Sequence, residues 1–220
     1  MPVSTGSVTL DEVLDGGLPD QRAVLVTGGP GTGKSTLAMQ FLQAGLDDGE
    51  ECLLVSTEQR MDELRDSFSD FEFDLDHESL AVTTLHATPG YTVDGEDDRV
   101  LTLETLEGGQ MLGGDYSAPF ESDYIVKHLE QFGPVDRVVL DSVSGLSTIG
   151  DSQDVFRRTV LDVIRLFTDD FGATALFTAE ESQPDPVQGD VKTVAASDAV
   201  QFNTHGGRCA ASTTTHAPTR

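Results

Sequence analysis

A glycine-rich run that ends in Lys-Ser is the segment of this chain whose residue types and spacing best suit chemistry. Residues 28 to 35 read Gly-Gly-Pro-Gly-Thr-Gly-Lys-Ser and fit the pattern G-x-x-x-x-G-K-[S/T]. Glycines let the backbone curl so that its N–H groups point inward at phosphate oxygens. An apolar run precedes the motif and a helical pattern follows it, so a helix N-terminus adds positive potential. The pattern predicts a phosphate-binding loop, or P-loop, for a nucleoside triphosphate. The residues expected to contact the nucleotide are Gly28, Gly29, Pro30, Gly31, Thr32, Gly33, Lys34, Ser35 and Thr36.

Two side chains of this run and one distant acid have defined expected roles. Lys34 is expected to reach the β- and γ-phosphates and to act in catalysis, and the Ser35 hydroxyl is expected to bind Mg²⁺. The apolar run 137–140 ends at Asp141, and a carboxylate at such a strand end holds the ion or one of its waters. The sequence therefore predicts a magnesium site made by Ser35 and Asp141, although a turn-forming role for Asp141 stays open.

Hydrolysis of a triphosphate also needs a group that orients the attacking water. Glu58 comes directly after the apolar run 52–57, and it would face the γ-phosphate if that strand lies next to the strand of Asp141. The alternative is an ordinary solvated loop acid. Thr178 and Glu180 end another expected strand, where they either sense the γ-phosphate or are simply polar strand ends.

Alternating strand and helix patterns must position these residues. Strands are expected at 23–27, 52–57, 80–85, 137–140, 173–178 and 199–202, and helices at 35–45, 61–71, 120–132 and 154–171. Such alternation predicts an α/β fold with a largely parallel central sheet and helices on both faces. Residues 1–202 are expected to form one domain, with a loop-like insertion at 86–119 that contains one candidate short element at 100–106. Residues 203–220, rich in Thr, Ala and Gly, are expected to be a disordered or degenerate tail.

The charge balance limits the classes of partner. The chain has 39 acidic and 13 basic residues and a formal net charge of −26. Such a chain repels itself at low salt, which favours a halophilic protein of a salt-rich cytoplasm or, alternatively, a protein with a basic partner. The absence of a basic stripe argues against nucleic acid. No apolar run reaches the length of a membrane span and no signal peptide is visible, so a cytoplasmic location is expected.

A further motif precedes the P-loop, because residues 10–19 read Leu-Asp-Glu-Val-Leu-Asp-Gly-Gly-Leu-Pro. This segment, together with the P-loop, resembles the LDxxLxGGLP segment that precedes the loop in the KaiC-like branch of the RecA-superfamily ATPases. Further similar segments are Gln40-Phe41-Leu42, Gly49-Glu50, Val55-Ser56-Thr57-Glu58, Leu140-Asp141-Ser142-Val143-Ser144-Gly145-Leu146 and Ala196-Ser197-Asp198-Ala199-Val200. The resemblance covers about residues 6–202. It implies a RecA-like core that binds ATP and Mg²⁺, and a homo-oligomer, ring or filament, whose subunits share ATP.

Two departures from the family pattern bear on activity. The resemblance implies a glutamate pair after the second strand, but Gln59 follows Glu58. It also implies a Lys-x-Arg finger after the late strand, and Arg208 is the only cation near that position. Three functions remain open. They are a slow regulatory or signalling ATPase, an ATP-responsive switch with negligible hydrolysis and a protein partner, and an accessory of DNA recombination or repair, which rests on fold kinship alone.

Overall fold

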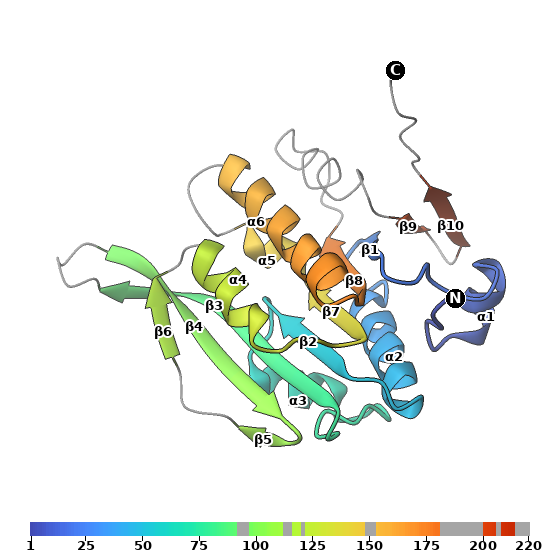
Figure 1. Cartoon of the computed structure of the whole chain (residues 1–220), viewed down its shortest axis with the longest axis horizontal. Coiled ribbons are helices and arrows are strands. Elements are labelled where there is room, and N and C mark those ends of the chain that lie inside the picture. Colours follow the sequence, from blue (N-terminus) through green and yellow to red (C-terminus); the bar gives the residue numbers. More distant parts are fainter. Residues whose placement is uncertain are drawn as a thin grey trace.

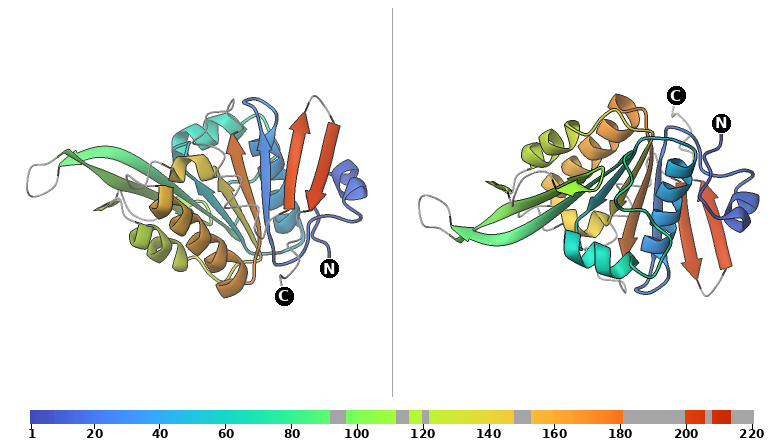
Figure 2. Two further views of the ribbon diagram at one scale, coloured as in Figure 1. Left: turned by 90° about the horizontal axis from the view of Figure 1, so that it is seen from above. Right: turned by 90° about the horizontal axis from the view of Figure 1, so that it is seen from below.

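The computed structural model describes residues 1–91, 97–111, 116–119, 122–147, 153–180, 200–205 and 208–213. Within these residues ten strands form one sheet, and helices cover both of its faces (Figures 1 and 2). The sheet order is β10-β9-β1-β8-β7-β2-β3-β4-β5, and β6 also pairs with β4. The pairings from β9 to β3 along this order are all parallel, and the outer ones are antiparallel. The expected α/β fold class is thus confirmed.

The central strands are apolar runs that lie buried on both faces of the sheet. They are β1 (Ala23–Gly28), β2 (Cys52–Ser56), β7 (Arg137–Asp141) and β8 (Thr174–Glu180). Almost every residue of these strands is buried, as expected for a parallel sheet between two helical layers. Their shared direction brings their carboxyl ends to one edge of the sheet.

The helices form two layers, each packed on its own apolar cluster. On one face lie α2 (Lys34–Asp47) and α3 (Met61–Phe68). On the other lie α4 (Ser122–Glu130), α5 (Val143–Leu146) and α6 (Gln153–Arg165), which continues as a π-helical turn, Leu166–Asp170. A short helix, α1 (Val8–Val13), precedes the sheet. No helix among the described residues is long and apolar enough to cross a bilayer.

The loop-like insertion expected at residues 86–119 is wrong, because most of this stretch is sheet. The strand β3 (Leu80–Tyr91) runs well past residue 85, and β4 (Asp97–Glu107) returns along it in an arm that projects from the body (Figure 2). Two short strands, β5 (Gln110–Met111) and β6 (Tyr116–Pro119), pair with β4. Backbone pairing with β3 stabilises β4, which also buries Leu101, Leu103 and Leu106.

The tail expected at residues 203–220 is also partly wrong. The strand β9 (Val200–His205) lies parallel to β1, and β10 (Arg208–Thr213) pairs with β9 as a hairpin that forms this edge of the sheet. Residues 214–220 lie outside the described residues. Ladder hydrogen bonds again form strands from a Thr- and Ala-rich segment without apolar alternation.

One buried cation connects the sheet to the helices. Arg137, at the start of β7, is 2% exposed and forms an ion pair with Glu50 through its Nε. Its Nη1 donates to the carbonyl oxygens of Ser4 at 2.7 Å and Phe41 at 2.9 Å. The guanidinium also lies 4.9 Å from the centre of the Phe41 ring. Arg137 therefore joins the N-terminal segment, α2 and the strand that ends at Asp141.

Candidate functional site: a phosphate-binding loop at the carboxyl edge of the sheet

The glycine-rich run connects the end of β1 to the start of α2, the context that the motif requires. Gly31 and Gly33 have φ angles of 71° and 85°, a left-handed conformation that side chains disfavour. Gly33 is the N-cap of α2, and Leu37 donates the first helical bond to its carbonyl at 2.9 Å. The first N–H groups of the helix, including those of Ser35 and Thr36, lack intrahelical acceptors, so this end attracts anions.

Side chains of the loop fold back onto its own backbone. The Lys34 ammonium donates to the Gly29 carbonyl at 3.1 Å, and the Thr32 hydroxyl donates to the same oxygen at 2.9 Å. Pro30 and Thr32 are exposed at the tip of the loop. The loop therefore presents an ammonium and a helix N-terminus at one exposed place.

The sheet order places the other expected residues along the same edge. From the loop outward, the strand ends follow the order β1, β8, β7 and β2. Gly28 is level with Glu180 on β8, and Ser56 on β2 is level with Asp141 on β7. The strand adjacency that the Glu58 prediction required, β2 beside β7, is therefore present. The strand β8 separates the loop from Asp141.

A buried hydroxyl holds the Asp141 carboxylate. Thr178 on β8 is fully buried and donates its hydroxyl to Asp141 Oδ1 in a short hydrogen bond. The other carboxylate oxygen has no partner among the described residues. A hard cation takes carboxylate and hydroxyl oxygens as ligands, so Asp141 and Ser35 fit Mg²⁺ chemically. Thr178 in this arrangement orients Asp141, a role that its place at a strand end did not reveal.

A second set of hydroxyls fixes the end of β2 to the end of β7. The Thr57 hydroxyl donates to the Ser142 carbonyl at 2.6 Å and accepts from the Ser142 N–H at 3.1 Å. The Ser142 hydroxyl donates to the Glu58 carboxylate in a short hydrogen bond and accepts from the Ser144 N–H at 3.1 Å. Gly145 allows this approach, since a Cβ there would lie 2.2 Å from the Thr57 hydroxyl oxygen. Glu58 itself is exposed, but its carboxylate is thereby anchored next to the end of β7, where Asp141 lies.

Gln59 faces another direction. Its side-chain amide donates to the Ser67 hydroxyl on α3 at 2.7 Å. Its backbone and the Ser56 hydroxyl exchange two hydrogen bonds, of 2.8 Å and 3.1 Å. The residue in the second position of the expected glutamate pair is thus part of the packing of α3.

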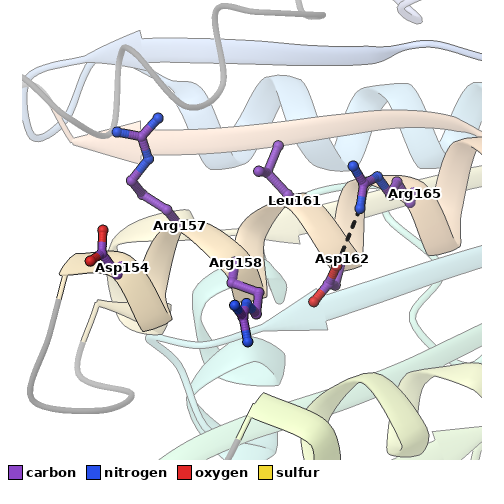
Figure 3. Close-up of a pocket in the computed structure, with 6 residues that line it drawn as sticks. All are labelled: Asp154, Arg157, Arg158, Leu161, Asp162 and Arg165. Atoms are coloured by element: carbon purple, nitrogen blue, oxygen red, sulfur yellow. Dashed lines mark ion pairs between the residues drawn. The ribbon is translucent and has the colours of Figure 1, made fainter.

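Two other features lie apart from this edge. Burial raises the pKa of the Cys52 thiol to about 12, so this cysteine is an inert core group. Among the described residues, a surface hollow is lined by α6 alone, whose exposed face carries Arg157, Arg158 and Arg165 (Figure 3). The P-loop leads into α2, which covers the other face of the sheet from α6. These arginines are therefore separate from the phosphate site.

A P-loop between a buried strand and a helix, with an acid at the end of a second parallel strand, defines the class of P-loop nucleotide-binding proteins. The sequence pattern of the family described as "ATPase: KaiC" matches residues 3–199. The chain belongs to the KaiC family of ATPases, and nucleotide binding is the family's property.

Individual relatives agree with this assignment. A UPF0273 protein of Methanopyrus kandleri is 30% identical over 167 residues, which cover 74% of this chain and 61% of the relative. A UPF0273 protein of Saccharolobus solfataricus is 29% identical over 79% of this chain and 58% of the relative. The chain thus spans about three fifths of the length of these curated relatives. The crystal structure of a KaiC-like protein from Pyrococcus horikoshii superposes with a TM-score of 0.66, at 21% identity over 92% of this chain and 81% of that one. This match shows the shared RecA-like fold.

Proposed function

We propose that this KaiC-family chain binds ATP with Mg²⁺ at residues 28–36 and hydrolyses it slowly, as a regulatory or signalling ATPase. One observation carries the proposal. The Glu58 carboxylate and the Asp141 carboxylate are each held by a side-chain hydroxyl on neighbouring strand ends, at the edge where the P-loop lies. Anchored acids of this kind suit a reaction in which positioning and electrostatics supply most of the rate.

Each group has a separate task in this scheme. The N–H groups at the start of α2 and the Lys34 ammonium bind the phosphates, and Ser35 and Asp141 hold the cation. Mg²⁺, when bound, neutralises charge on the β- and γ-phosphates. Glu58 orients the attacking water and accepts its proton. Its bond from Ser142 keeps the carboxylate at the end of β2 rather than free in solvent.

The rate is expected to be low for two reasons visible in the chain. Gln59 cannot ionise, and its amide is bound to Ser67 instead of facing the phosphate edge. The hairpin of β9 and β10 carries one arginine, Arg208, where the family pattern has a Lys-x-Arg pair. An arginine finger contributes on the order of 10³ to 10⁵ in rate where one acts. A site with one acid and no such pair is therefore slow.

The second candidate is an ATP-responsive switch with negligible hydrolysis. The contact of Gln59 with α3 favours it, because nucleotide at the neighbouring Glu58 would act on this helix and so on a partner surface. In either case we propose a homo-oligomer, in which the β9–β10 hairpin lies at an edge open to a neighbouring subunit. We do not extend the proposal to DNA, because the net charge of −26 opposes phosphate binding outside the loop.

The test is ATP turnover in KCl-rich buffer with and without Mg²⁺, with Lys34→Ala as the blank and mass measured by light scattering in parallel. High salt is chosen because the acidic charge is expected to suit a halophilic protein. We expect slow, Mg²⁺-dependent turnover that the blank lacks, together with an ATP-dependent oligomer. Binding of ATP without turnover would replace the ATPase by the switch. Failure to bind ATP would refute both.

A further inference from the structure

The loop that carries Glu58 is held by the projecting arm as well as by the neighbouring strand β7. This loop runs from the end of β2 to the start of α3, and Glu58 is anchored on one side by Ser142. On its other side the loop meets two side chains of the arm, Glu104 on β4 and His86 on β3. Both contacts fall within three residues of Glu58.

Glu104 makes the more extensive contact. Its Oε2 accepts the Met61 N–H, the first N–H of α3, at 3.1 Å and the Thr84 hydroxyl at 3.1 Å. Its Oε1 accepts a hydrogen bond from Arg60 Nη2 at 3.3 Å. The carboxylate is only 12% exposed, so these donors compensate for its loss of water. A negative charge at a helix N-terminus also interacts favourably with the helix dipole.

His86 adds a second connection from the arm. Its Nε2 lies 3.1 Å from the Gln59 carbonyl, and burial lowers the pKa of the ring, so the neutral imidazole donates to that oxygen at neutral pH. Residues 59, 60 and 61 are therefore each bonded to a side chain of the arm. A shift of β3 or β4 moves the backbone that follows Glu58.

We propose that Glu104 is a positioning residue, which holds the loop after β2 so that Glu58 faces the phosphate edge of the site. The inference rests on the proposed ATPase function for its catalytic consequence, but the contact itself is testable without hydrolysis. Glu104 does not touch the nucleotide in this scheme. Its effect reaches the reaction only through Glu58.

The test compares Glu104→Ala and Glu104→Gln with wild type. Glutamine keeps an acceptor for Met61 and Thr84, whereas alanine removes every contact. We expect Glu104→Ala to lower kcat about tenfold with KM for ATP changed less than about twofold, and Glu104→Gln to restore most of the rate. The matched control is Glu107→Ala, an exposed acid on the same strand whose loss leaves the loop untouched.

Two further measurements separate this proposal from simple destabilisation and from the proposed function. In a Glu58→Gln background, adding Glu104→Ala should cause no additional loss of rate, since the two residues act as one unit. An additional tenfold loss would overturn the inference, and so would an unchanged kcat in Glu104→Ala. If wild type hydrolyses ATP no faster than Lys34→Ala, the proposed function fails. Hydrogen exchange of the backbone amides then tests the positioning role of Glu104 without hydrolysis. Faster exchange at residues 57–64 in Glu104→Ala than in Glu107→Ala supports the positioning role, and equal exchange refutes it.

Discussion

Replacing Arg137 by methionine tests how the fold supports the strand that carries Asp141. Methionine keeps an unbranched apolar stem of similar length but removes the guanidinium. The change removes one hydrogen-bond donor each from the carbonyl oxygens of Ser4 and Phe41, in a site where Arg137 is 2% exposed. It also removes the partner of Glu50, whose side chain is 33% exposed.

The magnitude follows from these contacts. Each hydrogen bond lost from the charged guanidinium costs about 1 to 3 kcal/mol. The ion pair adds only about 0 to 1 kcal/mol, because Glu50 remains partly solvated. Loss of the contact with the Phe41 ring adds about 1 kcal/mol. Together these losses come to about 3 to 8 kcal/mol, which for a chain of 220 residues lowers Tm by roughly 10 to 25 °C.

Urea unfolding followed by circular dichroism measures this loss. Arg158→Met on the exposed face of α6 is the matched control, because it removes the same group from the surface. We expect the urea concentration at the midpoint of unfolding to fall strongly for Arg137→Met, with the dependence of the unfolding free energy on urea unchanged. The midpoint of the control should stay within experimental error of wild type. A loss below about 1 kcal/mol, no larger than that of the control, would refute the view that Arg137 joins the N-terminal segment and α2 to β7.

Three other outcomes follow from the described contacts. Gly145→Ala places a Cβ 2.2 Å from the Thr57 hydroxyl oxygen, so we expect at least a tenfold loss of turnover, about 1.4 kcal/mol, with ATP affinity retained; unchanged kinetics would contradict this packing. Burial lowers the pKa of His128 to about 4 from 6.5, so the unfolded chain takes up a proton first as pH falls. The free energy of unfolding should therefore fall as the pH is lowered from about 6.5 to about 4, by up to about 2 kcal/mol after allowance for partial exposure. Replacement of the ring in His128→Gln should remove this pH dependence. Raising KCl from about 0.1 M to about 2 M should raise Tm, because salt screens the net charge of −26; a fall would contradict the halophilic expectation.

The core of the fold was predictable because its signals are local. The strands β1, β2, β7 and β8 are short apolar runs, and burial between two helical layers is what such runs require. The P-loop was predictable because its backbone needs positive φ angles, which glycine adopts most easily. Gly31 and Gly33 have such angles in the structure.

The antiparallel additions to the sheet were not predictable in the same way. In β4 the alternation of the buried residues Leu101 and Leu103 breaks at Leu106, and β10 is a mixture of polar and small residues, Arg-Cys-Ala-Ala-Ser-Thr. These strands are held by ladder hydrogen bonds to their neighbours in the chain, β4 to β3 and β10 to β9, and hydrophobic periodicity alone does not reveal such pairing. The alternation of Leu101, Thr102, Leu103 and Glu104 was the available signal for β4.

Within the candidate site, sequence reasoning found the groups expected to meet the nucleotide but missed those that hold them. The hydroxyls of Thr57, Ser142 and Thr178 bond across neighbouring strands, from residues far apart in the chain. Glu104 is 46 positions from Glu58 and acts on the same loop. Such contacts appear only once the strand order is known, because threonine and serine at strand ends have many ordinary uses.

The most direct test of the account is single-turnover hydrolysis of Mg-ATP by wild type and by Glu58→Gln, with ATP affinity measured on the same samples. Glutamine keeps the size of the side chain and its bond with Ser142 but cannot accept the proton of the attacking water. We expect equal ATP affinity and a loss of hydrolysis of at least about a hundredfold. Equal hydrolysis by the two proteins at equal affinity would contradict the assignment of Glu58 and with it the proposed use of this edge of the sheet.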